Sequence, residues 1–132
     1  MSYVYSVIYF SLAVTPPSEP SLVTKTSFSL TIEWKLEDEL HEKMVEFYEI
    51  SSLSHNSMII NTLKPRSLQF QDEHKDHLKW IVINPKCKKN QFVVSNLKSL
   101  SFYSFKVRAY IKNHGWCAFS SVSQPFQTNR RM

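Results

Sequence analysis

The chain has 132 residues, 42% of them hydrophobic and 14% aromatic, with one glycine and two cysteines. This length fits one domain, and the apolar content excludes an intrinsically disordered chain. A single glycine excludes a Gly-rich phosphate-binding loop, and two cysteines exclude both a disulfide scaffold and a zinc site made of cysteines alone. The net charge of +5 arises from 16 Lys and Arg against 11 Asp and Glu, which indicates a mixed surface and not a basic footprint for nucleic acid.

The N-terminal stretch 3–14 is rich in aromatic and β-branched residues. At about a dozen residues it is too short to span a membrane, so no membrane span is predicted. We expect residues 1–16 to form an apolar N-terminal arm or an extra strand, because such residues favour strands. A signal peptide is the alternative, although no Lys or Arg precedes the apolar residues.

Two stretches alternate apolar and polar residues with the period of two that a half-buried strand requires. They run from Phe28 to Trp34 and, most clearly, from Tyr103 to Lys112. Further strands are expected at 45–50, 80–83 and 92–94, with a closing strand within 119–128. Residues 36–44 are expected to form a polar connection, 84–85 to end a strand, and 113–115 to form a turn. Short strands with turns between them predict an all-β sandwich of two antiparallel sheets.

The residues of these strands resemble the fibronectin type III family. Trp34 stands where that family has the Trp of its second strand, and residues 92–109 (FVVSNLKSLSFYSFKVRA) are similar to the family pattern around Tyr103. The resemblance covers residues 17–128, with 129–132 as a tail, and implies an immunoglobulin-like sandwich. The expected core residues are Trp34, Tyr48, Trp80, Leu97, Tyr103, Phe105 and Val107.

The resemblance also implies a role for Tyr103 as a tyrosine corner. Its ring would lie in the core, and its hydroxyl would bond to the backbone of the loop before it. Such a bond would satisfy a polar group that is otherwise costly to bury.

The chain departs from the family in one connection. The segment between Ile50 and Trp80 is longer than usual by about 20 residues, and loops of such length are often functional. We expect an insertion at about 53–79, between the third and fourth strands, to contribute to recognition, with Met58 and Phe70 as candidate contacts. No Arg-Gly-Asp occurs, so integrin recognition is not implied. No Trp-Ser-x-Trp-Ser occurs, so a cytokine-receptor interpretation lacks its mark.

Four further residues are candidate partner contacts. Lys106 and Arg108 point outward on the clearest strand, where they would either pair with acidic residues of the neighbouring strand or form a basic strip for an acidic partner. Trp116 and Phe119 lie in or beside the last loop. They would serve as exposed anchors, since aromatic residues are frequent hot spots, or alternatively as caps over the end of the sandwich.

Metal binding, catalysis and disulfide formation have weaker support in the sequence. The polar stretch 71–77 contains Asp72, His74, Asp76 and His77 but no closed set of metal ligands, so a solvated loop without metal is expected. No nucleophile motif such as Gly-x-Ser-x-Gly occurs, so no catalytic or cofactor-binding residue is assigned. Cys87 and Cys117 would pair only if their Cα atoms came within about 6 Å; otherwise they are small buried residues.

We therefore expect a non-catalytic protein–protein interaction module without a cofactor, monomeric as an isolated domain. The lack of an Asn-x-Ser/Thr acceptor favours an intracellular or scaffold-type protein. Nucleic acid is disfavoured because the basic run 86–89 lacks interleaved aromatic residues. The alternatives are a secreted or receptor ectodomain module, which would be extracellular, and a structural spacer without its own ligand.

Overall fold

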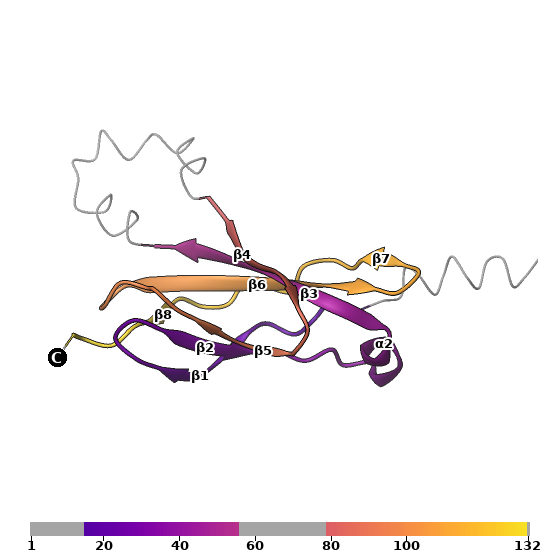
Figure 1. The fold of residues 1–132 in the computed structure, drawn as a ribbon, viewed down its shortest axis with the longest axis horizontal. Helices are drawn as coiled ribbons and strands as arrows, with labels where there is room; N and C mark the ends of the chain where they lie inside the picture. The colour runs from indigo at the N-terminus through magenta and orange to yellow at the C-terminus, as the bar shows by residue number, and fades with distance from the viewer. Residues whose placement is uncertain (1–14, 56–78, 132) are drawn as a thin grey trace, which may run out of the picture.

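The structure is a computed structural model that describes residues 15–55 and 79–131, which fold as two antiparallel β-sheets packed face to face (Figure 1). In chain order the elements are β1 (Ser21–Lys25), β2 (Leu30–Glu33), α2 (Glu39–Lys43), β3 (Val45–Ser54), β4 (Ile81–Cys87), β5 (Gln91–Val94), β6 (Phe102–Ile111), β7 (Gly115–Trp116) and β8 (Phe126–Gln127). One sheet has the order β1-β2-β5. The other has the order β4-β3-β6-β7, and β8 also pairs with β6. The predicted all-β sandwich is confirmed.

The core between the sheets follows from the alternation of β2 and β6. Leu30, Ile32 and the following Trp34 point inward from one sheet, and they meet an inward row of β6 that includes Phe105 and Val107. The Trp34 ring packs edge to face on Tyr48 of β3, with centroids 5.4 Å apart. Burial of these apolar side chains is the main favourable contribution to folding.

Two residues expected in the core lie at or beyond its margin. Leu97 is half-buried and packs against the core cluster from the β5–β6 connection. Trp80 is not part of that cluster, so its assignment to the core is wrong. It directly precedes the edge strand β4, and its ring instead faces the ammonium group of Lys106 on the outer side of the sheet.

Residues 36–44 were expected to be a polar connection, but the structure has a short helix there. Asp38 caps α2, and its carboxylate accepts hydrogen bonds from the backbone N–H groups of Leu40 and His41 at 2.9 and 3.3 Å. Glu39 and Glu42 in the first turn suit the positive end of the helix. The charged residues thus encode a capped turn.

The strands that flank the long connection extend further than predicted. β3 continues through Ser54 with Leu53 buried, so the expected start of the insertion at Leu53 is wrong. β4 continues through Asn84 and Pro85 instead of ending there. Pro85 is tolerated because β4 is an edge strand, where a missing N–H need not cost a ladder bond. Residues 1–14 and 56–78, including Met58, Phe70 and the stretch 71–77, lie outside the described residues.

The tyrosine corner is present. The Tyr103 ring is buried, and its hydroxyl oxygen accepts a hydrogen bond of 3.0 Å from the backbone N–H of Lys98. This bond ties the start of β6 to the loop after β5.

We predict that Tyr103→Phe lowers the free energy of unfolding by about 1 kcal/mol, the net contribution of one hydrogen bond. Urea unfolding of the variant and the parent chain measures this difference. An unchanged midpoint with an unchanged slope would show that the corner contributes nothing to stability.

Candidate functional site

The outer face of the β4-β3-β6-β7 sheet is formed by the residues of β6 that do not enter the core. Lys106, Arg108 and Tyr110 alternate there with the buried row. The register of β3 places Glu49 opposite Arg108 and Phe47 opposite Tyr110. Since side chains on alternate positions share a face, these residues form one continuous surface.

Cations and aromatic rings alternate across this surface. The Lys106 Nζ atom lies 4.5 Å from the ring centroid of Trp80 and 4.2 Å from that of Phe119. The Arg108 guanidinium carbon lies 4.8 Å from the Phe119 centroid and 4.1 Å from that of Trp116. These distances are within the range of cation–π attraction. We call Trp80, Lys106, Phe119, Arg108 and Trp116 the outer-face ladder.

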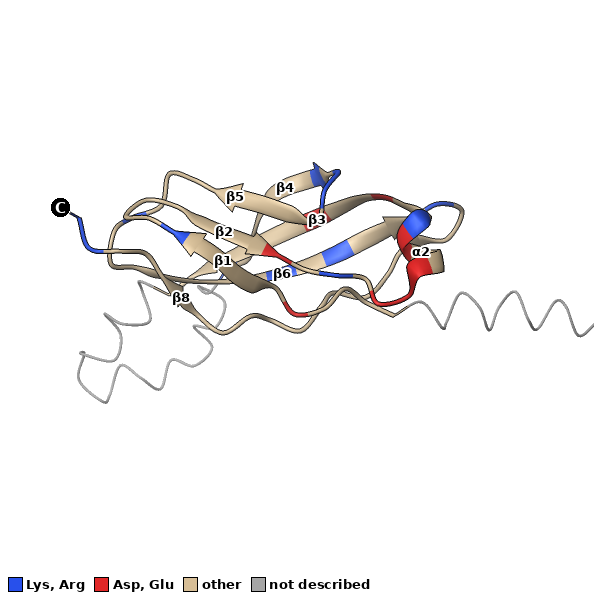
Figure 2. Ribbon diagram, turned by 90° about the horizontal axis from the view of Figure 1, so that it is seen from below, with Lys and Arg blue, Asp and Glu red and all other residues tan. Residues whose placement is uncertain are grey.

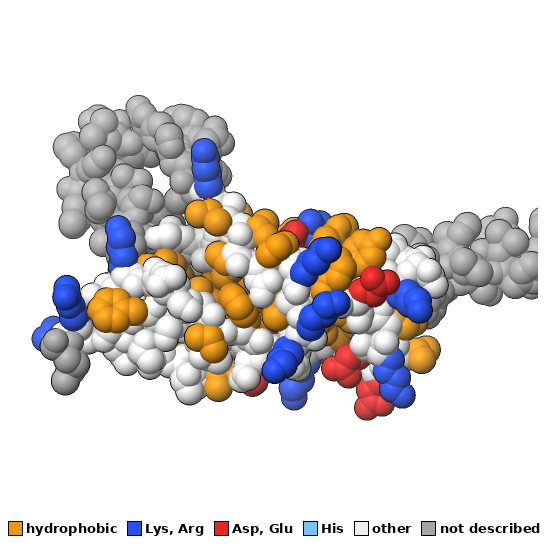
Figure 3. Space-filling view, viewed as in Figure 1, with side chains coloured by type: hydrophobic (Ala, Val, Ile, Leu, Met, Phe, Trp, Pro, Cys, Tyr) orange, Lys and Arg blue, Asp and Glu red, His pale blue; other side chains and the backbone are white. Residues whose placement is uncertain are grey.

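An aromatic cluster continues the ladder at its Trp116 end. Phe47 stacks on Tyr110 with centroids 5.1 Å apart, and Trp116 meets both rings edge to face at 5.6 and 5.2 Å. The Nζ atoms of Lys86 and Lys88 lie 5.6 and 5.9 Å from the Phe47 centroid. Figure 3 shows hydrophobic and basic side chains intermixed along the upper side of the molecule, over β3, β4 and β7. The basic run thus has aromatic neighbours after all, from other strands.

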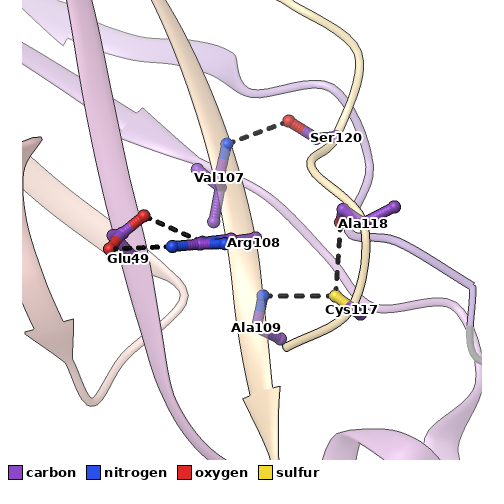
Figure 4. Close-up of polar contacts among 7 residues, drawn as sticks. All are labelled: Glu49, Val107, Arg108, Ala109, Cys117, Ala118 and Ser120. Carbon is purple, nitrogen blue, oxygen red and sulfur yellow. Dashed lines mark hydrogen bonds and ion pairs between the residues drawn. The ribbon is translucent and has the colours of Figure 1, made fainter. Parts of the chain in front are cut away.

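The expected cross-strand ion pair is present between β3 and β6. Arg108 Nε donates to Glu49 Oε1 at 2.9 Å, and a terminal guanidinium nitrogen donates to Oε2 at 3.4 Å (Figure 4). The Arg108 side chain is 29% exposed and that of Glu49 12%. The pair neutralises Arg108 and fixes its plane beneath Trp116, because a two-pronged contact restricts the guanidinium.

Phe119 lies in the segment 117–125, and Trp116 directly precedes it. A closing strand was expected within 119–128, but the regular strand there is β8 alone. This segment joins β7 to β8, which pair with opposite ends of β6. Every third residue bonds to β6: the backbone N–H groups of Cys117, Ser120 and Ser123 donate to carbonyl oxygens of β6 at 2.9, 2.7 and 2.9 Å. The hydrogen bonds therefore recur every three residues along the segment 117–125 and every two residues along β6.

The side chains of these three residues complete the contact. The Val107 N–H donates to Ser120 Oγ at 3.0 Å, the Phe105 N–H to Ser123 Oγ at 2.9 Å, and the Ala109 N–H to Cys117 Sγ at 3.2 Å. Figure 4 shows the Ser120 and Cys117 contacts on either side of Arg108. The hydroxyl and thiol groups thus replace the backbone carbonyls of a regular strand.

The residues 116–120, Trp-Cys-Ala-Phe-Ser, were not recognised as a unit from the sequence. They have aromatic rings at the first and fourth positions of Trp-Ser-x-Trp-Ser, and small hydrogen-bonding side chains at the second and fifth. A search by side-chain chemistry instead of residue identity would have found this signal.

The two cysteines are both free and lie on different strands or segments. Cys117 accepts the Ala109 N–H, and burial raises the pKa of its thiol. Cys87 is buried and donates to the Lys89 carbonyl. Both are the small buried or half-buried residues that the sequence suggested.

Two other side chains have shifted pKa values. Burial, and next the nearby Glu42 carboxylate, raise the pKa of Tyr48 to about 12. Burial lowers the pKa of His55, whose Nε2 atom lies 2.8 Å from Ser104 Oγ. Within 15–55 and 79–131 there is no group of three or more His, Cys, Asp or Glu that could hold a metal ion. The helix in those ranges is too short to span a membrane.

No family model and no curated protein matches this chain. Solved structures do match. The third fibronectin III domain of the human KIAA0343 protein has a TM-score of 0.64 at 15% identity, over 92% of this chain and 87% of that one. Titin module A71 from human cardiac muscle has a TM-score of 0.59 at 19% identity, over 86% and 90%. Domains A168–A170 of titin have a TM-score of 0.60 at 17% identity, and the match covers 86% of this chain but 32% of that one.

These matches define the class of the fold as an immunoglobulin-like β-sandwich. Within that class, the chain has the fold of a fibronectin type III domain, as the sequence resemblance implied.

We predict that Ser120→Ala lowers the free energy of unfolding by about 1–3 kcal/mol, because it leaves the buried Val107 N–H without its side-chain acceptor. Ser121→Ala is the matched control, since that neighbouring residue is exposed. Thermal and urea unfolding compare the two variants. Equal stability of the two would contradict the role of the Ser120 hydroxyl.

We predict that Arg108→Gln costs about 1–3 kcal/mol, because it leaves the Glu49 carboxylate without its donor in a mostly buried place. The double variant Glu49→Gln/Arg108→Gln should be more stable than Arg108→Gln, since no unpaired carboxylate remains. Lys112→Gln, at an exposed position just after β6, is the control. Urea unfolding of the parent chain, Arg108→Gln, Glu49→Gln and the double variant gives the coupling energy, and a coupling of zero would contradict the prediction.

Proposed function

We propose that this chain is a non-catalytic protein-interaction module that binds its partner through the outer face, with Trp116 as the principal contact. The observation that supports this is the state of Trp116. The residue is 40% exposed, yet its ring is held between Arg108, Phe47 and Tyr110. An exposed aromatic residue that is already ordered loses little entropy on binding, and aromatic residues dominate binding hot spots.

The ladder extends this contact across the sheet. Phe119 and Trp80 are both half-buried; Lys106 and Arg108 lie over the Phe119 ring, and Lys106 lies over the Trp80 ring. The partner would therefore meet a face whose side chains have few alternative positions. Such preorganisation favours affinity and specificity over the same area of mobile side chains.

The insertion after β3 is a separate candidate for recognition. The preceding strand β3 ends at Ser54, and Ser54 pairs with Tyr103 at one end of β6. Trp116 pairs with Tyr110 near the other end of β6. The two elements are separate in the sequence, so their contributions can be measured with separate variants.

We propose an intracellular, reducing location for this chain, and the free thiols of Cys87 and Cys117 support it. A second candidate function is a receptor ectodomain module. The observation that favours it is the residues 116–120, which share Trp116 and Ser120 with the receptor mark and replace its other two defined residues by Cys117 and Phe119, of similar side-chain chemistry.

A quantitative pull-down from a lysate of the native source tests the proposal. We expect Trp116→Ala to weaken retention of the partner by about thirtyfold, since truncation of a hot-spot residue costs about 2 kcal/mol. Phe28→Ala is the matched control, because Phe28 is 48% exposed but precedes β2 on the opposite sheet. Circular dichroism establishes that both variants fold.

A third variant in the same experiment replaces residues 56–78 by a short polar loop. Loss of the partner in this variant alone, with Trp116→Ala unaffected, would assign recognition to the insertion and reject the outer face. Retention of the same proteins by all three variants would favour the spacer interpretation.

A further inference from the structure

The outer face has an excess of positive charge that its own residues do not compensate. Among the described residues, Glu49 is the one carboxylate paired with a cation of this face, and its partner is Arg108. Lys86, Lys88 and Lys106 have no carboxylate within 4.0 Å in the described part of the chain. The Lys88 Nζ atom instead donates a hydrogen bond of 3.4 Å to the backbone carbonyl oxygen of Glu46.

These three ammonium groups are partly held against aromatic rings. Lys106 lies between two rings, at 4.2 and 4.5 Å from their centroids, while Lys86 and Lys88 lie over Phe47. Ring contact displaces water from one side of a cation but supplies no anion. A carboxylate that arrives from a partner therefore meets a cation whose water shell is already incomplete, and attraction is stronger there than in open solvent.

The described acidic residues are spread over several elements, including Glu33 on β2 and Glu46 and Glu49 on β3. Asp38, Glu39 and Glu42 lie in or next to α2, at the end of the sandwich (Figure 2). Because Lys86, Lys88 and Lys106 have no carboxylate partner among the described residues, an acidic partner would be attracted to the outer face.

The spacing of the groups along β6 indicates the shape of the partner. Lys106 and Tyr110 are four residues apart on one strand, which corresponds to about 13 Å in extended chain. An extended peptide laid along β6 repeats its side chains at the same interval. It can therefore place an acidic residue at Lys106 and an aromatic residue against Tyr110 and Trp116, with further acidic residues at Lys86 and Lys88.

We propose that the ligand of the outer face is an acidic, extended polypeptide segment that also carries aromatic side chains. This inference rests on the proposed function and specifies the chemistry of its partner. Single-stranded nucleic acid could use the same cations and rings, so it is included as an outcome of the test.

The probe is a fluorescein-labelled random copolymer of Glu and Tyr, which presents all spacings of the two residues. Fluorescence anisotropy with the full chain measures the affinity of the copolymer, and the changes it causes in amide chemical shifts locate its binding site. We expect shifts at β6 and β7, and binding weakened about tenfold by Lys86→Glu/Lys88→Glu, two exposed positions. The matched control is Lys25→Glu/Lys35→Glu, with the same change of charge at exposed positions of the other sheet and its flank; it should weaken binding less than about threefold.

Three results would overturn the inference. The first is no binding of the copolymer, or binding that both charge variants weaken equally. The second is tighter binding of a thymidine oligonucleotide, or equal binding of polyglutamate, which lacks rings. The third is self-association in sedimentation that only Lys86→Glu/Lys88→Glu removes, which would assign the face to a second copy. Loss of the native partner by Trp116→Ala together with any of these would leave the proposed function standing and reject only the acidic ligand.

Discussion

The central strand β6 determines both faces of this domain. Its period-two pattern directs Phe105 and Val107 into the core and Lys106 and Arg108 to the outer face. A slip of one residue against β3 would exchange the two sets, burying two cations and exposing Phe105 and Val107. Such a state is excluded by the cost of burying unpaired charge. The core and the candidate site therefore depend on the same register.

The sequence predicts the fold best where alternation is strict. The inward row of β6, the strand ending at Trp34 and the hydroxyl bond of Tyr103 all follow from local pattern or from the family resemblance. It predicts less well where tertiary contacts decide the outcome. β1 has a mostly exposed pattern with no alternation to reveal it, and it is a strand because it pairs with β2. Pro85 signals the end of a strand, yet an edge position tolerates it.

The candidate site is only partly visible in the sequence. Lys106, Arg108, Trp116 and Phe119 were selected individually, from their direction on a strand or their place in a loop. Their alternation in one ladder depends on the segment 117–125, whose three-residue period differs from both templates used to recognise strands and helices. Trp80 joins the ladder from the other edge of the sheet, across the long connection, and no local pattern can predict such a contact.

The segment 117–125 connects the stability of the domain to the proposed recognition. The ring of Phe119 belongs to it, and Trp116 directly precedes it. Single side chains such as Ser120 and Ser123 hold it to β6 by accepting buried N–H groups. Because local stability is set by the contacts of the local unit, loss of these contacts would loosen the segment before the main core. Opening of the segment would displace the rings from the cations. A partner that requires the intact ladder would therefore stabilise the closed segment, since a ligand favours the state that it binds.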